Sequence, residues 1–196
     1  NIYISFNLLK YNKKIEMSKS LNYLLPKYQF KEYHSIFVNG EINDVFMHVK
    51  EMDLSDSKIA CILMYIWRIV ARFFINDLSN SNMSVSDFIQ LEYLPPFEIS
   101  RGLIGGGGKP KNYKKISPEE FKDFNAKETI KLVWAFWLSS ELPKKTIIHT
   151  ETRVFCSDRP TYIKFLLYWI IIRPWSGLIR IRLLKSIKKK TELVKI

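Results

Sequence analysis

The stretch PTYIKFLLYWIIIRPWSGLIRIRLLKSIKKK, residues 160–190, decides the fold because it is long, apolar on one side and basic at its end. Its large apolar side chains recur every three or four residues, the spacing of one helix face: Tyr162, Phe165, Leu166, Trp169 and Ile172. Pro174 lacks a backbone donor and is expected to kink or interrupt this helix. The sequence therefore predicts a long C-terminal helix whose apolar stripe covers another layer.

Two strands are predicted before this helix, over residues 130–139 and 146–156, joined by a turn at residues 142–145. Alternating positions of a strand face opposite sides of a sheet, so each strand has one inward face. That face is expected to carry Leu132, Trp134, Phe136 and Leu138 from the first strand, and Ile148, Thr150, Thr152, Val154 and Cys156 from the second. The pair is expected to pack its inward face on the C-terminal helix.

The other positions of these two strands are expected to face away from the helix. Glu151 and Arg153 alternate with the inward threonines, so they are interpreted as a solvent-side ion pair rather than a catalytic pair. Trp137 is expected to point outward as well, which makes it a candidate contact for a partner or for the N-terminal segment.

The rest of the chain supplies further strands and short helices. Strands are expected over residues 28–38, 90–94 and 97–104, and Pro95-Pro96 marks a turn because proline cannot donate to a sheet. Helices are expected over residues 41–52 and 58–75, around the pair Ser84 and Asp87, and from the capping box Ser117-Pro118-Glu119-Glu120. This element order predicts an α+β fold with one curved antiparallel sheet, whose buried face is covered by the C-terminal helix.

Composition and length bound the class of protein. The chain has 196 residues, 47% of them hydrophobic, which excludes a disordered or low-complexity chain. Two cysteines, Cys61 and Cys156, form no disulfide framework and, with three histidines, no zinc spacing, so a cytoplasmic protein is expected. The expected organisation is an N-terminal extension at residues 1–25, disordered or, before Met17, not native to the protein, and one domain at residues 26–196.

The formal net charge is +12, and more than half of it lies at the C-terminal end. Residues 173 to 196 contain eight lysines and arginines and one acidic residue, Glu192, which gives this segment a net charge of +7. The basic end is interpreted either as a solvated helix tip, whose cations suit the negative end of the helix dipole, or as a contact with an anionic membrane surface. In the second interpretation the apolar side is expected to be Leu178, Ile179, Leu183 and Leu184. No motif supports nucleic-acid binding.

The two long apolar runs are not expected to span a membrane. Residues 59–75 contain Arg68 and Arg72, and residues 165–179 contain Arg173. Neither run offers the roughly 20 uncharged residues that a spanning helix needs. Both are therefore interpreted as core helices.

Several short stretches carry a family resemblance. In the first strand and its entry into a helix they are Lys31-Glu32-Tyr33-His34, Val38-Asn39-Gly40-Glu41 and Val45-Phe46, followed by Met52-Asp53-Leu54-Ser55. In later elements they are residues 98–105, 117–124, 134–136, 150–154 and 173–180. Over about residues 28–190 the chain resembles an uncharacterised bacterial branch of the SRPBCC, or START-like, superfamily. This superfamily of helix-grip proteins includes polyketide cyclases, lipid-transfer domains and hormone-binding proteins.

The resemblance implies a helix-grip fold with a cavity between sheet and C-terminal helix that binds a small hydrophobic or amphipathic ligand. One departure lies at Gly106-Gly107-Gly108, where the branch tends to have bulky residues. A phosphate loop is rejected there, because Leu103 and Pro110 stand where that motif needs Gly and Ser or Thr. Residues 105–108 are interpreted as a mobile lid or as a loose surface turn.

The candidate ligand-binding residues lie on the inward face. His34 is interpreted as a core histidine satisfied by a backbone group or water, or as a polar anchor or acid/base group in the cavity. Arg101 is a buried cation awaiting a carboxylate or an anionic ligand if its strand turns it inward, and is solvated if the register slips. The remaining candidates supply aromatic walls and hydroxyl groups, and they are Trp134, Phe136, Thr150, Thr152 and Trp169.

Three functions remain open. The first is a START-like protein that binds a small ligand; the second is a cyclase- or hydrolase-like enzyme that uses His34; the third is a peripheral membrane protein that uses the basic C-terminal helix. The lack of a legible acid/base pair or nucleophile arrangement favours binding over catalysis, so no catalytic residue is assigned. His48 and His149 do not converge with His34 on a metal site, and neither a metal nor another cofactor is expected.

Overall fold

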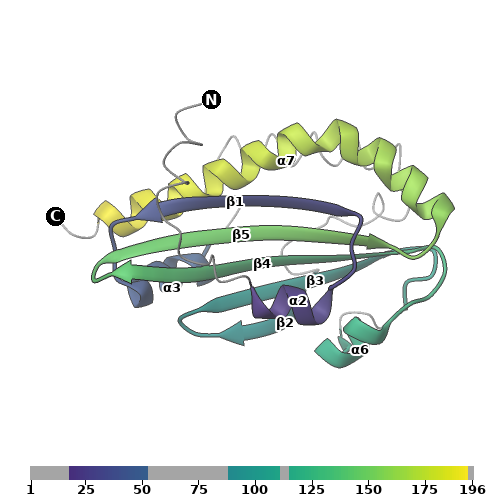
Figure 1. Cartoon of the computed structure of the whole chain (residues 1–196), viewed down its shortest axis with the longest axis horizontal. Helices are drawn as coiled ribbons and strands as arrows, with labels where there is room; N and C mark the ends of the chain where they lie inside the picture. The colour runs from purple at the N-terminus through teal and green to yellow at the C-terminus, as the bar shows by residue number, and fades with distance from the viewer. Residues whose placement is uncertain (1–17, 53–87, 111–114, 194–196) are drawn as a thin grey trace.

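The computed structural model describes residues 18–52, 88–110 and 115–193 of the chain. Five strands form one antiparallel sheet in the order β1-β5-β4-β3-β2 (Figure 1). The strands are β1 Phe30–Val38, β2 Ile89–Leu94, β3 Glu98–Gly106, β4 Thr129–Leu142 and β5 Lys145–Cys156. The described helices are α2 Lys19–Leu24, α3 Ile42–Lys50, α6 Pro118–Asp123 and α7 Arg159–Leu193. The α+β prediction, an antiparallel sheet with a long C-terminal helix in a helix-grip arrangement, is confirmed.

Helix α7 runs along one face of the sheet and arches over it (Figure 1). Pro174 lies inside the helix and does not interrupt it. The predicted apolar stripe is the packed face, because Phe165 and Ile172 are buried and Trp169 is partly buried against the same cluster. We call the side of the sheet that α7 covers the α7 face.

Two hydrophobic clusters occupy the α7 face, one under each half of the helix. The first cluster joins the first half of α7 to the sheet, and its members are Phe30, Ile130, Val154, Cys156, Phe165, Tyr168 and Ile172. The second cluster joins the second half of α7 and helix α3 to the sheet, and its members are Val38, Val45, Phe46, Val49, Ile99, Phe136, Leu138, Ile148, Leu183, Leu184 and Ile187. The sheet between these clusters carries buried polar side chains, among them Glu32, Thr150 and Thr152.

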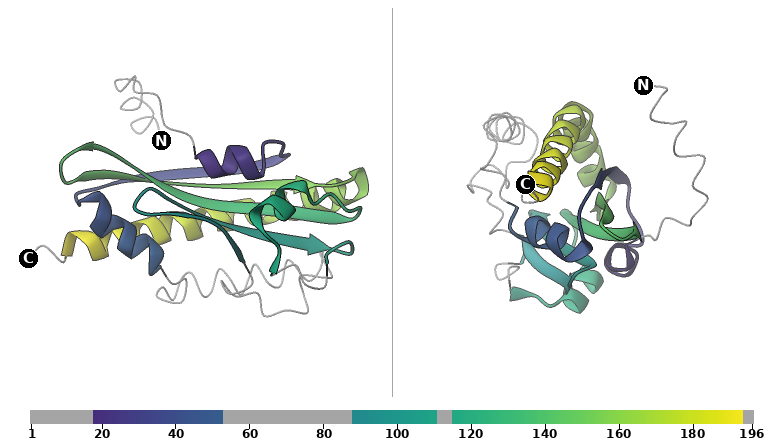
Figure 2. Two further views of the ribbon diagram at one scale, coloured as in Figure 1. Left: turned by 90° about the horizontal axis from the view of Figure 1, so that it is seen from below. Right: turned by 90° about the vertical axis from the view of Figure 1, so that its left-hand side faces the viewer.

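The opposite face of the sheet is covered by α2 and α6 (Figure 2). Leu21 and Leu24 of α2 and Phe121 of α6 are buried in one cluster with strand residues such as Val133. Residues 18–25, predicted as part of an N-terminal extension, are therefore packed on the sheet, and the folded part includes at least the chain from Ser18.

This second layer corrects the prediction for Glu151 and Arg153. The two side chains do pair, with 2.6 Å between Arg153 Nε and Glu151 Oε1, and they do face away from α7. Both are buried, however, because the N-terminal segment covers them: Arg153 donates to the Leu25 carbonyl, and the Tyr28 ring lies 4.6 Å from its guanidinium. The pair is not on the solvent side. Period-two alternation identified the face but carried no information about the layer that covers it.

Trp137 shows the same effect. It faces away from α7 as predicted, but it is buried with Leu21 and Leu24 of α2. Of the two contacts expected for it, the N-terminal segment is the one that the structure shows.

The glycines at residues 105–108, interpreted as a mobile lid or a surface turn, lie at the end of β3 and in the turn that follows it. Gly105 and Gly106 belong to β3 and pair with β4. Gly106 has φ +97°, and a Cβ there would lie 2.1 Å from the carbonyl oxygen of Glu128. A Cβ on Gly108 would lie 2.1 Å from the Lys127 carbonyl oxygen. These glycines let the end of β3 approach the backbone before β4 closely.

Other local predictions are confirmed or fall outside the described residues. The capping box of α6 is complete, because Glu120 N donates to Ser117 Oγ (3.1 Å) and Ser117 N donates to Glu120 Oε2 (2.6 Å). Pro95-Pro96 forms the turn between β2 and β3. The helix expected at residues 58–75 and the capping box at Ser84 and Asp87 lie outside the described residues. In the described part of the chain, none of the helices combines the length and apolar character of a membrane span.

Candidate functional site

Two adjacent rows of side chains cross the α7 face, because paired residues of an antiparallel sheet point to the same side. From the edge strand β1 across to β2, the first row is Glu32, Thr152, Trp134, Arg101 and Gln90. The second row is His34, Thr150, Phe136, Ile99 and Tyr93. Six of the seven predicted ligand-binding residues therefore share one surface. The seventh, Trp169, is on α7 and packs against Phe30 and Phe165.

At the β1 end of these rows, a hydrogen-bonded cluster fixes α7 to the sheet. We call it the Glu32 cluster, and its members are Glu32, His34, Thr152, Ser176 and Arg180. Glu32 Oε2 accepts from Arg180 NH1 at 2.8 Å and from Ser176 Oγ at 2.9 Å, and Oε1 lies 3.0 Å from His34 Nε2. Arg180 NH2 donates to Thr152 Oγ1 at 2.7 Å. Each Glu32 oxygen therefore has a partner.

The electrostatics of the Glu32 cluster follow from burial and pairing. Burial alone would raise the pKa of the Glu32 carboxyl, but the His34 hydrogen bond, the Arg180 charge and the Ser176 hydroxyl together hold that pKa below its ordinary value. Burial lowers the pKa of Arg180, and the Glu32 charge opposes that shift. The cluster is thus a buried, hydrogen-bonded ion pair, in which NH1 and NH2 of Arg180 have partners and its buried Nε has none among the described residues. Breaking such a pair from one side costs several kcal/mol.

A glycine makes this contact close. Gly177 is on the sheet-facing side of α7, and a Cβ there would lie 2.9 Å from Glu32 Oε1 and 3.6 Å from His34 Nε2. Glycine is unfavourable inside a helix by about 1 kcal/mol relative to alanine, so its presence here reflects the space that the carboxylate needs.

His34 therefore has a partner that sequence reasoning did not predict. It faces α7, as predicted, and its Nε2 pairs with the Glu32 carboxylate. Its side chain is 24% exposed. The interpretation of His34 as a polar anchor for a ligand would require a ligand to share this carboxylate.

The centre of the rows is filled by packing. Phe136 is buried and Trp134 packs against the same cluster, with 4.9 Å between their ring centroids. The Trp134 indole donates to Thr150 Oγ1 at 2.8 Å. The predicted aromatic walls are thus in contact with each other, and the hydroxyls of Thr150 and Thr152 are engaged by Trp134 and Arg180.

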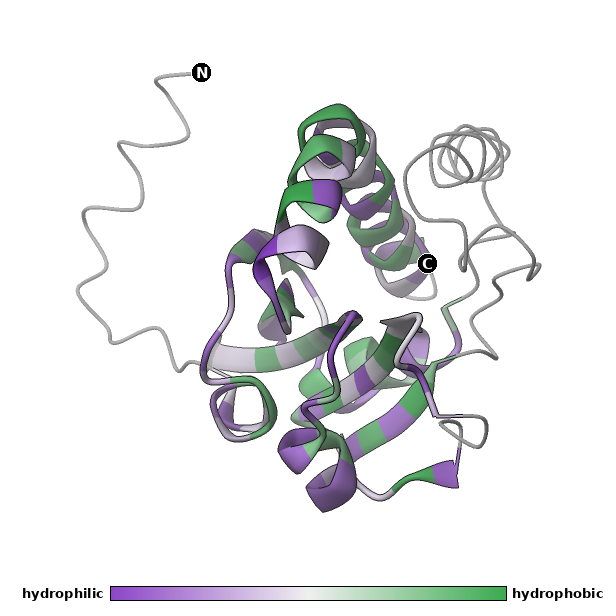
Figure 3. Ribbon diagram, turned by 90° about the vertical axis from the view of Figure 1, so that its right-hand side faces the viewer, coloured by the Kyte–Doolittle hydropathy of each residue, from purple (hydrophilic) through white to green (hydrophobic). Residues whose placement is uncertain are grey.

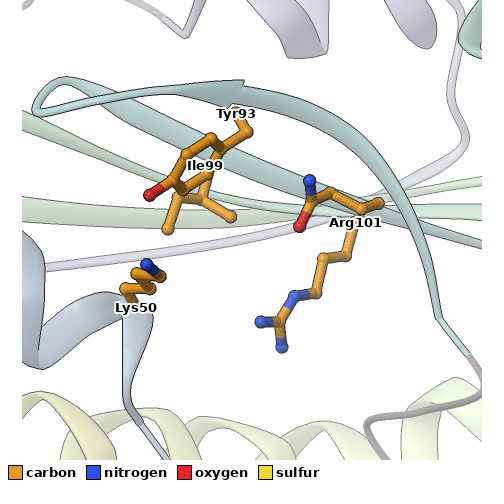
Figure 4. Close-up of a pocket in the computed structure, with 5 residues that line it drawn as sticks. Lys50, Tyr93, Ile99 and Arg101 are labelled. Carbon is orange, nitrogen blue, oxygen red and sulfur yellow. The ribbon is translucent and has the colours of Figure 1, made fainter.

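At the β2 end of the same rows, the structure has an open hollow with a volume of about 330 Å³. We call it the Arg101 hollow, and it is lined by Lys50, Gln90, Tyr93, Ile99 and Arg101 (Figure 4). Arg101 projects from β3 away from the sheet, and Lys50 reaches the same space from the last turn of α3. Ile99 supplies a buried apolar wall. The hollow therefore combines two cations with one apolar surface.

Arg101 differs from Arg180 in having no counter-charge among the described residues. Burial lowers the pKa of its guanidinium, and within residues 18–52, 88–110 and 115–193 no carboxylate offsets that effect. Of the two alternatives left open for Arg101, the structure shows the inward one, because Arg101 pairs with Trp134 of β4 on the α7 face. Lys50 Nζ lies 5.7 Å from the centroid of the Tyr93 ring, which adds a second positive group to the hollow.

The Glu32 cluster and the Arg101 hollow are separate places. Their backbone positions are three strands apart in the order β1-β5-β4-β3, and adjacent strands lie about 4.8 Å apart, so the separation is about 14 Å. The Trp134 and Phe136 side chains lie between them in the rows. The predicted candidates are thus divided between two environments, with His34 and Thr152 in one and Arg101 in the other.

Sequence reasoning missed several residues of both places. Glu32 shares its strand face with His34 and could have been found from the same alternation. Ser176 and Arg180 are four residues apart on α7, but which face of α7 meets β1 depends on tertiary packing. Gln90 and Tyr93 become neighbours of Arg101 only through the β2–β3 pairing, which contains a bulge between Gln90 and Glu92.

Two groups elsewhere do not add to this site. His149 lies on the α2-covered face, where Tyr33 and Ser139 hold its ring nitrogens, and burial lowers its pKa to about 4. Burial raises the pKa of the Cys156 thiol to about 12, so it is unreactive at neutral pH. The described residues contain no cluster of histidine, cysteine and acidic side chains that could hold a metal ion.

Comparison of the sequence with family models and with curated proteins finds no match. Among solved structures, a conserved protein from Geobacillus kaustophilus is 11% identical with a TM-score of 0.40, covering 82% of this chain and 96% of its own. A hypothetical protein from Helicobacter pylori is 10% identical with a TM-score of 0.42, covering 92% of this chain and 98% of its own. Likenesses this remote carry no argument about the site.

Proposed function

We propose that the protein binds a small anionic amphiphile in the Arg101 hollow. The observation that carries the proposal is a half-buried guanidinium with no described carboxylate partner, facing an open hollow that also contains Lys50. A buried charge is stabilised by an opposite charge, and here the described protein residues do not provide one. A ligand with a carboxylate, sulfate or phosphate group would provide it.

The other walls of the hollow support an amphiphile rather than a bare anion. Ile99 is buried at its base, and the Tyr93 ring and the Gln90 amide border it. Arginine can hold a carboxylate through two parallel hydrogen bonds, while the apolar wall accepts the ligand's hydrocarbon part. The proposal keeps the START-like interpretation of the sequence, with a small amphipathic ligand, and places the polar anchor at Arg101 instead of His34.

Binding is proposed in preference to catalysis. His34, the residue considered for acid/base chemistry, is held by Glu32 about 14 Å across the sheet from the hollow. The described lining of the hollow offers cations, an amide and a phenol, and it contains neither a carboxylate nor an imidazole. This set suits recognition of an anion better than proton transfer.

Titration calorimetry with dodecanoate, below its micelle concentration at pH 7.5, tests the proposal. We expect saturable binding to the wild-type protein, and binding at least tenfold weaker to Arg101→Gln, because a charge-assisted hydrogen bond contributes about 1.5–3 kcal/mol. Lys127→Gln removes an exposed lysine from the turn before β4 and serves as the charge-matched control. It should bind like the wild type.

Two uncharged or oppositely charged probes complete this test. Dodecanol and dodecyltrimethylammonium share the hydrocarbon chain, so both should bind at least tenfold more weakly than dodecanoate. Equal binding of all three probes, or equal loss in Arg101→Gln and Lys127→Gln, would refute recognition of an anion in the Arg101 hollow.

We infer a second function, contact with an anionic membrane surface, from the basic end of α7. Arg182, Lys185 and Lys189 are exposed near that end. The anionic lipids of a cytoplasmic leaflet attract such clusters by about 1 kcal/mol per basic side chain. Part of the apolar side expected from the sequence is already used, because Leu183 and Leu184 are buried against the sheet and α3.

A further inference from the structure

The side of α7 that faces away from the sheet carries an exposed apolar stripe. Hydrophobic turns are visible on that side of the helix in Figure 3. The side chains of the stripe are 37–63% exposed, and they are Ile163, Leu167, Ile170, Ile171, Leu178 and Ile181. We call these six residues the outer stripe. Their spacing follows one helix face, opposite to the one that carries Phe165 and Ile172.

The outer stripe is long for a surface feature. From Ile163 to Ile181 the helix rises by about 27 Å, at 1.5 Å per residue. Single exposed apolar side chains are ordinary on protein surfaces, but a continuous apolar strip of this length marks an interaction surface. The core does not need these residues, because α7 already packs on the sheet through its other side.

The charged residues around the outer stripe indicate what binds to it. Exposed Lys164 and Arg173 flank the outer stripe, and beyond its end the exposed residues become Arg182, Lys185 and Lys189. A second copy of the chain is disfavoured in either orientation. Parallel helices would bring two basic ends together, and antiparallel helices would lay each basic end on the partner's apolar stripe. An anionic lipid surface offers hydrocarbon and negative charge together.

We propose that α7 lies flat on an anionic bilayer, with the outer stripe inserted among the lipids and the basic end against their headgroups. This inference rests on the membrane contact proposed above and identifies the face that makes it. The buried Leu183 and Leu184 stay in the core, so docking requires no rearrangement of α7. Interfacial helices of this kind combine an apolar face with a cationic one and bind through both.

Vesicle co-sedimentation of the full chain tests the inference. The vesicles are phosphatidylcholine alone, or phosphatidylcholine with 30% phosphatidylglycerol. We expect wild-type protein to bind the anionic vesicles at least tenfold more tightly than the neutral ones. The double variant Leu167→Ser/Ile170→Ser should lose at least tenfold, and Lys185→Gln/Lys189→Gln about tenfold. Phe97→Ser, which removes an exposed aromatic ring from the β2–β3 turn, should bind as the wild type does.

The outcomes distinguish failure of the outer stripe as the contact face from failure of membrane contact itself. If wild-type protein ignores anionic vesicles, membrane contact itself is wrong. If it binds them and the serine double variant binds equally well, membrane contact stands and the outer stripe is not the contact face. Light scattering gives the remaining outcome: a wild-type dimer that the serine double variant dissociates would assign the stripe to a second copy. Circular dichroism of each variant confirms that a loss of binding is not a loss of folding.

Discussion

Two arginines on the α7 side of the sheet have opposite surroundings. Arg180 comes down from the helix at the β1 end, where Glu32, Ser176 and Thr152 hold its guanidinium. Arg101 rises from β3 at the other end of the same rows, where the described residues supply a hollow and a second cation but no carboxylate. Burial lowers the pKa of both. The difference lies in whether the protein itself provides the counter-charge.

This difference separates a structural role from a binding role. A buried ion pair that is also hydrogen-bonded fixes the position of two elements, in this case α7 and β1. A cation that faces open space without a partner contributes little to that purpose and is available to a ligand. Substitutions at either end should therefore remove this difference or make it larger.

The largest effect is expected from removing the carboxylate that pairs with Arg180. Glu32→Gln leaves Arg180 buried without a counter-charge and should lower the free energy of unfolding by about 3–5 kcal/mol, measured by urea denaturation. Arg101→Gln, the matched change at the other end, should alter that free energy by no more than about 0.5 kcal/mol. Equal losses in the two variants would show that the two arginines have the same role.

Lowering the pH should remove the contribution of Glu32 to the free energy of unfolding. Because its folded pKa lies below the ordinary value of 4.5, the carboxylate stabilises the fold fully at pH 7 and progressively less as the pH falls below about 4.5. The stability gap between wild type and Glu32→Gln should therefore narrow from pH 7 to pH 4 and below. Urea titrations of both proteins across this range measure the gap, and a gap that widens toward acid would contradict the account.

A smaller loss is expected from crowding the Glu32 cluster. Gly177→Ala places a methyl group 2.9 Å from Glu32 Oε1. In most helix interiors this substitution stabilises, but here we expect a loss of about 1 kcal/mol, because the carboxylate is held on several sides and must shift. A gain in thermal stability for Gly177→Ala would show that the carboxylate has room to move.

The smallest stability effect is expected from giving Arg101 a protein partner. Gln90 pairs with Arg101 across the β2–β3 ladder, so Gln90→Glu places a carboxylate beside the guanidinium. A cross-strand ion pair contributes about 0.2–1 kcal/mol, measured as a small rise in the urea midpoint. The same variant should lose dodecanoate binding at least tenfold. Unchanged binding in a stabilised Gln90→Glu protein would separate Arg101 from the ligand.

The sequence predicted the sheet and α7 well because both depend on local periodicity. Alternation placed Trp134, Phe136 and Thr150 on the α7 side, and three- and four-residue spacing identified the packed side of α7. Predictions about solvent exposure did less well. Glu151 and Arg153 are buried because the N-terminal segment at Leu25 and Tyr28 covers them. The packing of a segment far away in sequence leaves no periodic signal in the strand.

The candidate site was predictable only in part. Arg101 was identified with both of its alternatives, an inward cation or a solvated one, and pairing with β2 and β4 decided between them. Lys50 enters the hollow because α3 ends beside β2 and β3, and Glu32 gains its role because Arg180 reaches it from α7. Both depend on contacts between segments far apart in the chain, and such contacts leave no local pattern that can be recognised in a single sequence.

The central claim is that Arg101, and not Arg180, receives an anionic ligand. The most direct measurement is an NMR titration of the arginine Nε–Hε signals with dodecanoate, with Arg101→Gln used to assign the Arg101 signal. We expect the Arg101 signal to shift progressively with ligand while the Arg180 signal stays in place. A shift of the Arg180 signal alone, or no shift of either signal at saturating ligand, would contradict it.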